Sequence, residues 1–240
     1  MARDEVYRGQ PTEAGSFEFS EAVVKVFPDM IERSVPGYRL LLDHTPLLVR
    51  NAVQPNSRIY DLGCSIGAAT LAARRAVPWD DVEIIAVDAS PNMVERCRQC
   101  TQADNSRVPV KVVEADVTEL VIESASVVLL YFTLQFIAQA KRNELIRTIQ
   151  RGLKPGGVLI LAEKLCFEPH QQQWLDQHHH DFKRSQGYSD LEIARKRQAL
   201  EQVLVPETLD AHQSRLLEAG FSHVVPWFQS FNFAALTAIK

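Results

Sequence analysis

The stretch Ile59-Tyr-Asp-Leu-Gly-Cys-Ser-Ile-Gly-Ala-Ala-Thr70 decides the fold. A short apolar run ends in an acid, and two glycines then separate it from residues that favour a helix. A glycine turn between a first strand and a first helix lets a ligand approach the backbone closely and meet amide hydrogens. The stretch therefore predicts a ligand-binding turn at the carboxyl end of a β-strand.

The glycine spacing differs from the dinucleotide fingerprint G-x-G-x-x-G. Ser65 occupies the second glycine position, Ala68 occupies the third, and Asp61 stands at the mouth of the strand. A carboxylate at that point would repel a pyrophosphate. It favours a ligand that carries positive charge, such as an amino-acid ammonium group or a sulfonium.

Three more signals accompany the glycine turn. Asp88 ends the next apolar run, where a carboxylate can accept two ribose hydroxyls. Asp116, in Glu114-Ala-Asp-Val117, is placed to accept a hydrogen bond from the exocyclic amine of adenine. The last signal is Gly152-Leu-Lys-Pro-Gly-Gly157, a turn that leads into a fifth strand. Open α/β sheets bind ligands beyond the carboxyl ends of their strands, so we expect all four signals at that edge.

Short apolar runs alternate with helical stretches in the middle of the chain. Strands are expected at 58–62, 82–87, 108–114, 125–131 and 158–163, and helices at 68–77, 91–101, 141–152 and 207–219. This alternation predicts a parallel sheet with helices on both faces. The last two runs, 223–229 and 232–239, have a tight connection and must pair antiparallel, so the sheet should be parallel except at one edge.

The length of 240 residues fits one domain, 1–240, with additions. Residues 1–55 are expected to form an N-terminal helical cover with breaks at Pro28 and at Ser34-Val-Pro-Gly-Tyr38. Residues 164–204, rich in charge, His and Gln, predict a helical insertion over the active site, before the sixth strand.

The composition excludes several classes. Lys and Arg number 26 against 30 Asp and Glu, a net charge of −4, which disfavours direct binding to a nucleic acid backbone. Residues 1–10 do not resemble a signal peptide, and no apolar run reaches the roughly 18 residues of a membrane span. We therefore expect a soluble, cytoplasmic protein that binds neither nucleic acid nor membrane.

The four cysteines are too few and scattered for a disulfide framework. Cys97 and Cys100 form a lone CxxC, and a structural zinc site would need two further ligands. The consecutive residues His178–His180 cannot all face one metal, because neighbouring helical residues point about 100° apart. We expect no metal site.

The segment after the fourth strand, Tyr131-Phe-Thr-Leu-Gln-Phe136, lacks the Asn/Asp-Pro-Pro-aromatic motif of amino-methyltransferases, and no cysteine is placed as a base-methylating nucleophile. The four signals together resemble the class I S-adenosyl-L-methionine-dependent methyltransferase (Rossmann-like) fold. That resemblance implies an α/β fold whose seven-stranded, mostly parallel sheet has an antiparallel last strand.

Longer blocks carry a narrower resemblance, to the carboxy-S-adenosyl-L-methionine synthase family, over nearly the whole chain after the first dozen residues. They are Val26-Phe-Pro-Asp-Met-Ile-Glu-Arg-Ser-Val-Pro-Gly-Tyr38, Tyr60 to Thr70, Phe132 to Phe136, His180 to Arg184 with Gly187 to Ser189, and Trp227 to Gln229 with Phe231 to Phe233. The resemblance implies an enzyme, a transferase, that turns S-adenosyl-L-methionine and prephenate into carboxy-S-adenosyl-L-methionine and phenylpyruvate. It also implies a homodimer whose product serves the modification of a tRNA wobble uridine to uridine 5-oxyacetic acid.

By the same resemblance, contacts to the S-adenosyl-L-methionine substrate and its carboxylated product fall on ten positions. They are Tyr38, Gly63, Cys64, Ser65, Asp88, Ala89, Asp116, Val117, Tyr131 and Arg197. Asn is common in the family where this chain has Ala89 and Tyr131. No catalytic residue is assigned.

Arg197 is expected to hold the added carboxylate through its planar fork. The residues alone favour another interpretation, in which the run Arg195-Lys-Arg197 has no role in binding and only forms a solvent-exposed helix face. Candidates for the prephenate carboxylates are His180, Lys183 and Arg184. Two other functions stay open: an ordinary small-molecule methyltransferase, and a non-catalytic S-adenosyl-L-methionine-binding partner in tRNA modification.

Overall fold

The computed structural model describes residues 3–8, 19–201 and 203–240. Within them one seven-stranded sheet has the order β3-β2-β1-β4-β5-β7-β6. The strands are β1 (Ser57–Leu62), β2 (Val82–Asp88), β3 (Val110–Glu114), β4 (Ala125–Tyr131), β5 (Leu153–Lys164), β6 (His223–Ser230) and β7 (Phe233–Ile239). Strands β1 to β5 pair parallel, and β7 pairs antiparallel with both of its neighbours. The predicted parallel sheet with an antiparallel last strand is confirmed, with β6 at the outer edge.

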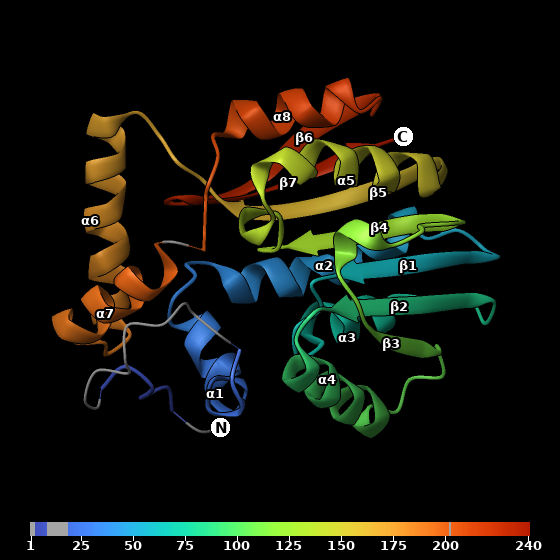
Figure 1. Ribbon diagram of the computed structural model, residues 1–240. Helices are drawn as coiled ribbons and strands as arrows, with labels where there is room; N and C mark the ends of the chain where they lie inside the picture. Colours follow the sequence, from blue (N-terminus) through green and yellow to red (C-terminus); the bar gives the residue numbers. More distant parts are fainter. Residues whose placement is uncertain (1–2, 9–18, 202) are drawn as a thin grey trace.

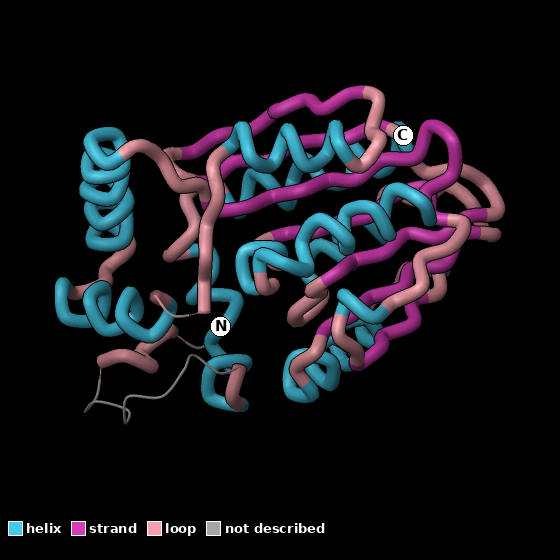
Figure 2. The backbone as a smooth tube through the Cα atoms, turned by 45° about the horizontal axis from the view of Figure 1, so that its top comes forward, coloured by secondary structure: helices cyan, strands magenta, loops and turns pink. Residues whose placement is uncertain are grey.

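Helices cover both faces of the sheet (Figures 1 and 2). One face packs against α2 (Tyr38–Ala52), α3 (Ala68–Arg74) and α4 (Pro91–Ala103), and the other against α5 (Gln139–Gly152) and α8 (Leu209–Glu218). Strand β4 is buried along its whole length, and its side chains alternate between the two hydrophobic clusters. This period of two is what a central strand covered on both sides requires.

The expected break at Pro28 is wrong. Helix α1 (Glu21–Glu32) runs through that proline. Ser20 caps its start, and Val23, Val24 and Met30 are buried on either side of Pro28. The packing of this apolar face therefore outweighs the hydrogen bond that proline cannot donate. The second expected break is confirmed, because Gly37 adopts a positive φ of 78° and α2 begins at the next residue.

The predicted insertion consists of α6 (Pro169–Ser185) and α7 (Asp190–Leu200). The chain turns between them at Gly187, whose φ is +87°, and the capping box of Ser189 and Glu192 starts α7. Both helices stand with α1 at the edge where β1 and β4 end (Figure 1). Residues 1–2, 9–18 and 202 of the predicted cover and insertion lie outside the described residues.

The turn at residues 152–157 was expected beside the other ligand signals, and this is wrong. Leu153 already belongs to β5 and pairs with Ala125, the first residue of β4. A turn that leads into a parallel strand lies at the amino end of that strand, across the sheet from the carboxyl edge. No helix in the described part of the chain is long and apolar enough to cross a membrane.

Candidate functional site

A cavity of about 870 Å³ lies at the carboxyl edge of the sheet, within the size range of small-molecule sites. Its walls come from the ends of β1, β2 and β4 and from α1, α2, α6 and α7. All ten positions expected to contact S-adenosyl-L-methionine line it. They are Tyr38, Gly63, Cys64, Ser65, Asp88, Ala89, Asp116, Val117, Tyr131 and Arg197. The fold thus brings together residues as far as 159 positions apart, from Tyr38 to Arg197; their contacts with a ligand stay a prediction.

The glycine turn is held tightly against β2. The backbone N–H groups of Gly63 and Cys64 both donate to the carbonyl of Val87, at 2.8 and 2.9 Å. Gly63 has a φ of +82°, and a Cβ at this position would overlap the hydroxyl of Thr133. Ser65 adopts a φ of +51°, a strained conformation of a kind common at ligand sites. Only glycine fits at position 63, and the backbone of the turn is left close to the cavity.

Carboxylates form one end of the cavity. Asp61 is almost fully buried and accepts a hydrogen bond of 2.5 Å from Thr70, yet burial raises its pKa to about 6. Asp88 accepts backbone hydrogen bonds from Ser65 and Ser90, at 2.8 and 2.9 Å, and burial raises its pKa. This negative end agrees with the cationic ligand expected from the sequence.

Asp116 lies at the same end of the cavity and is more exposed to solvent than Asp61 and Asp88. Its Oδ1 accepts a 2.8 Å hydrogen bond from the backbone of Thr118, and this bond lowers its pKa. Lys141, also lining the cavity, has its Nζ 3.9 Å from the other carboxylate oxygen. Asp116 is therefore ionised and partly exposed, as a hydrogen-bond acceptor at the rim should be.

Two buried tyrosines form the middle of the cavity. Burial raises the pKa of both Tyr38 and Tyr131, so both phenols are neutral. The Tyr131 oxygen lies 3.0 Å from the hydroxyl of Thr45. Because Thr45 donates its own hydrogen to the carbonyl of Leu41, Tyr131 must be the donor in that pair. The phenol oxygen of Tyr131 keeps only acceptor capacity, whereas an Asn at this position would offer both a donor and an acceptor.

Cations gather at the opposite end of the cavity, beside the insertion. Burial lowers the pKa of Lys164, brings that of Lys183 to about 8 and brings that of Lys196 to about 7. Burial also lowers the pKa of His179 to about 2, so this imidazole is neutral. Neither Lys164 nor Lys196 was predicted from the sequence as a site residue. Lys164 ends the fifth strand, a position that the rule on strand ends could have indicated.

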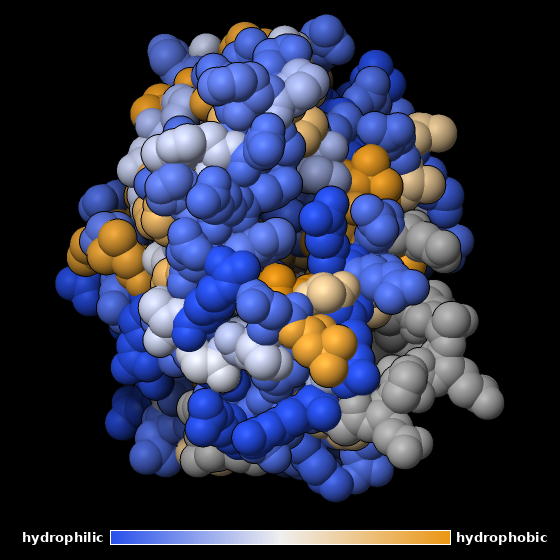
Figure 3. Space-filling view, turned by 90° about the vertical axis from the view of Figure 1, so that its left-hand side faces the viewer, coloured by the Kyte–Doolittle hydropathy of each residue, from blue (hydrophilic) through white to orange (hydrophobic). Residues whose placement is uncertain are grey.

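Arg184 does not reach this cavity. Its guanidinium lies 2.6 Å from Asp181 and 2.7 Å from Asp190 on the surface. Figure 3 shows the side of the molecule on which α6 and α7 lie, and this side is mainly hydrophilic. Arg184 lines a separate pocket of about 320 Å³. Of the three candidates for the prephenate carboxylates, His180 and Lys183 line the main cavity. Arg197 lines both spaces and is exposed.

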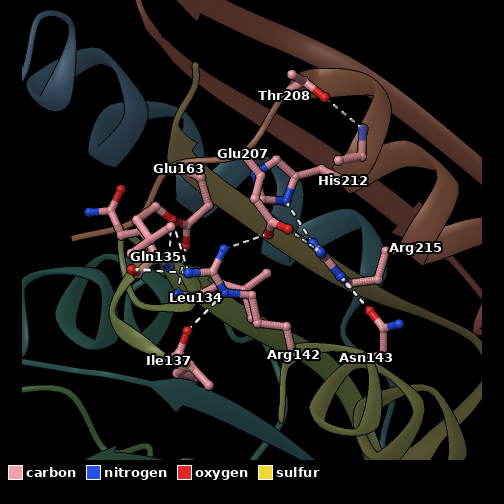
Figure 4. Close-up of polar contacts among 12 residues, drawn as sticks. Leu134, Gln135, Ile137, Arg142, Asn143, Glu163, Glu207, Thr208, His212 and Arg215 are labelled. Carbon is pink, nitrogen blue, oxygen red and sulfur yellow. Dashed lines mark hydrogen bonds and ion pairs between the residues drawn. The ribbon is translucent and has the colours of Figure 1, made fainter. Parts of the chain in front are cut away.

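Behind the cavity wall, Glu163 supports the loop that contains η2 (Leu134–Phe136). Its buried carboxylate accepts three backbone hydrogen bonds, from Thr133, Leu134 and Gln135 at 2.8–3.1 Å. Burial nevertheless raises its pKa to about 8. Figure 4 shows these contacts beside Arg142, which joins the same loop to Glu207. The pattern of the sequence offered no signal for this network, because its members lie far apart along the chain.

Two of the four cysteines pack in one small core cluster. Cys64 and Cys97 are both buried, and a hydrogen bond between them together with burial raises the pKa of the Cys64 thiol. A thiol held neutral in this way is a poor nucleophile and metal ligand. No group of three or more His, Cys, Asp or Glu side chains in the described part of the chain is arranged to hold a metal ion.

Comparison with known proteins first defines the class. A family profile described as a methyltransferase domain matches residues 59–157. The crystal structure of an O-methyltransferase family protein from Burkholderia thailandensis superposes with a TM-score of 0.65 at 15% identity, covering 92% of this chain and 59% of that one. The fold is therefore that of the class I methyltransferases.

Two relatives narrow the assignment. A carboxy-S-adenosyl-L-methionine synthase from Geobacter sp. is 52% identical over 239 residues, 99% of this chain and 98% of the relative. A protein of the same name from Yersinia pseudotuberculosis is 49% identical and covers 99% of this chain and 90% of the relative. This chain belongs to the carboxy-S-adenosyl-L-methionine synthase family.

Proposed function

We propose that the protein converts S-adenosyl-L-methionine and prephenate into carboxy-S-adenosyl-L-methionine and phenylpyruvate. One observation carries the proposal beyond the family name: a single cavity has a carboxylate-lined end and a cation-lined end. The first suits a substrate with a sulfonium and an ammonium group. The second suits a co-substrate with carboxylates, which an ordinary methyl transfer does not need.

The carboxylates at one end of the cavity fit the polar groups of S-adenosyl-L-methionine. Asp88 retains lone pairs for ribose hydroxyls after its two backbone contacts, and Asp116 is ionised and placed for an adenine amine. Asp61 matches a cationic group beside the turn. Val117 is buried and lines the cavity, so it offers an apolar surface to the adenine ring.

The reaction balances without an external base. Prephenate becomes aromatic when its ring loses carbon dioxide and hydroxide, leaving phenylpyruvate. The hydroxide takes a proton from the methyl group, whose hydrogens are acidified by the adjacent sulfonium, and forms water. The resulting carbanion attacks carbon dioxide, so a new carbon–carbon bond places a carboxylate on the former methyl. The protein is then required for position and charge complementarity rather than for a strong acid or base.

A cavity lined by neutral phenols and by lysines of low exposure fits this requirement. Tyr38, Tyr131 and the ring of Phe132 give the middle of the cavity an apolar character. Carbon dioxide and a carbanion both need to be kept from bulk water until they combine. We further propose that the protein is a homodimer and that its product supplies the carboxymethyl group for tRNA wobble uridine modification. Because that product diffuses, the enzyme itself needs no tRNA-binding surface.

The deciding experiment is mass analysis of the nucleoside product. Purified protein is incubated with S-adenosyl-L-methionine and prephenate, and we expect S-adenosyl-L-methionine to gain the mass of carbon dioxide while phenylpyruvate is released in equal amount. Omission of prephenate is the control. S-adenosylhomocysteine with a methylated acceptor would instead establish a methyltransferase. An unchanged ligand would indicate a binding protein.

A further inference from the structure

The cation-lined end of the cavity carries an excess of positive charge. Among the described residues that line it beside the insertion and the end of β5, the charged side chains are four cations and two carboxylates. They are Lys164, Lys183, Lys196, Arg197, Asp176 and Glu201. The excess of positive charge is complementary to a ligand with carboxylates, and these side chains come from the end of β5, from α6 and from α7 with the residue that follows it.

Lys196 already has partners within the protein. Its ammonium donates to the hydroxyl of Ser34 at 2.8 Å and lies 3.9 Å from a carboxylate oxygen of Asp4. The ammonium is also 5.6 Å from the centre of the Tyr188 ring. Lys196 therefore links α7 to the N-terminal segment and has little capacity left for a ligand.

Lys183 and Lys164 differ from Lys196 in this respect. The Lys183 side chain is only 8% exposed, and no hydrogen bond or ion pair joins its ammonium to any described residue. The ammonium of Lys164 likewise has no hydrogen bond or ion pair with any residue in the described part of the chain. Each side chain is close enough to Arg197 for that charge to lower its pKa, and Lys164 also lowers the pKa of Lys183. Lys183 is buried and Lys164 half-buried, and both line the same cavity. Cations with so little solvent are stabilised by a bound anion.

Asp176 is the carboxylate on α6 that faces these lysines. It raises the pKa of both, but its Oδ1 accepts a 2.8 Å hydrogen bond from Gln172, and no ion pair within 4 Å joins it to either lysine. The neighbouring His180 loses part of its basicity by burial. Asp176 therefore screens the two lysines without replacing the missing anion.

We propose that Lys164 and Lys183 bind the side-chain carboxylate of prephenate, the one kept in phenylpyruvate, and that Arg197 lies at the ring carboxylate that is transferred. This assignment rests on the proposed function. Two buried cations on the ring carboxylate would stabilise the ground state more than the uncharged carbon dioxide that it becomes, and would slow its loss. They should hold the carboxylate that does not react, and the exposed Arg197 should meet the transferred group again in the product.

Phenylpyruvate is the probe that separates the two carboxylates, because it contains only the retained one. We expect Lys183→Met and Lys164→Met each to raise the inhibition constant of phenylpyruvate and the KM for prephenate about 10- to 100-fold. The dissociation constant of S-adenosyl-L-methionine should stay within about twofold of wild type. Arg197→Met should weaken carboxy-S-adenosyl-L-methionine and leave phenylpyruvate binding within about twofold. Arg184→Met, one residue along α6 from Lys183, is the matched control and should change none of these values.

Three results would overturn the assignment. They are unchanged phenylpyruvate inhibition in both lysine variants, loss of phenylpyruvate binding in Arg197→Met, and a parallel loss of S-adenosyl-L-methionine affinity in the lysine variants. Lys183→Arg keeps the charge and the fold and should recover much of the phenylpyruvate affinity, so a variant that fails to fold does not end the test. Failure of the proposed function is seen separately, as absence of the carboxylated product with wild-type protein.

Discussion

At the scale of the residue, Asp61 is under two opposing demands. It is 1% exposed, and burial favours its neutral form and raises its pKa to about 6. The nearby charge of Asp88 acts in the same direction, while the hydrogen bond from Thr70 acts against it. A cationic ligand needs the ionised form. The protein therefore keeps a carboxyl group whose ionisation costs free energy until positive charge arrives.

This conflict predicts a pH dependence. Because the folded pKa lies above the unfolded value, the unliganded protein is stabilised below about pH 4 and loses this contribution, about 3 kcal/mol, as the pH rises through about 6. The affinity for S-adenosyl-L-methionine should instead rise over the same range and level off above pH 7, as measured by calorimetry. Asp61→Asn should remove the rise. Asp116→Asn is the control, because the pKa of Asp116 is lowered and its titration lies below this range. An equal pH profile in wild type and Asp61→Asn would contradict the prediction.

At the scale of the element, Arg142 of α5 connects the loop around η2 with the segment of residues 203–208 between the insertion and α8. Its guanidinium donates to the carbonyls of Gln135 and Ile137 and lies 2.6 Å from Glu207 (Figure 4). It also donates to the carbonyl of Val205. The side chain of Arg142 is 1% exposed. Glu207 is shared with a second arginine, from α8, also at 2.6 Å. One buried charge network therefore sets the position of the loop that forms part of the cavity wall.

Removal of this guanidinium should be costly. Arg142→Met removes the guanidinium hydrogen bonds from three carbonyls, of which, among the described residues, only that of Gln135 keeps another donor, the backbone N–H of Val205. It also leaves Glu207 with one arginine partner instead of two. We expect a loss of about 3–5 kcal/mol in the free energy of unfolding, measured by urea denaturation. Arg147→Met, on the same helix, removes an exposed pair with Glu144 of 3.6 Å and should cost less than about 1 kcal/mol. Similar midpoints for the two variants would show that the network has no special role.

At the scale of the whole molecule, the N-terminal segment at residues 3–8 ties the insertion to α1. Asp4 accepts a hydrogen bond from the hydroxyl of Tyr188, and its backbone N–H donates to Asp29 at 2.7 Å. Arg33 donates to the carbonyls of Asp4 and Gln186, at 3.3 and 2.8 Å. The cover and the insertion, which both line the cavity, are therefore held together by contacts of Asp4 in this short N-terminal segment.

Loss of the Asp4 charge should weaken the contact between the insertion and the N-terminal cover without unfolding the sheet. In Asp4→Asn we expect amide hydrogen exchange in α6 and α7 to become about tenfold faster, since a charged hydrogen bond and the partner of Lys196 are weakened together. Exchange in β1 and β4 should not change. Glu5→Gln removes only an exposed contact with Arg8 and serves as the control. A uniform increase over insertion and sheet alike would mean that Asp4 supports global stability instead.

The local signals were accurate where a backbone conformation or a strand end carries the information. The turn at Gly63 has a positive φ and close packing, which only glycine allows, so its conformation could be predicted from one residue type. The acids at positions 88 and 116 were found for a similar reason, since the carboxyl ends of parallel strands must share an edge. The errors, at Pro28 and at the turn of residues 152–157, arose where packing or the strand direction outweighed a local preference.

The sequence by itself determined the class of fold and the strands at whose ends Asp61, Asp88 and Asp116 lie, because these depend on short-range rules, namely the period of apolar residues, the conformational range of glycine and the ends of strands. The ten predicted contact positions came from the family resemblance, and all of them line the cavity. Only the tertiary structure decided which charges face one another. It placed Lys183 and Lys164, but not Arg184, in the lining of the main cavity. It also buried Arg142 against Glu207. Such contacts link residues that are distant in the chain or differ by one helical position, and side-chain direction in the packed molecule alone distinguishes them.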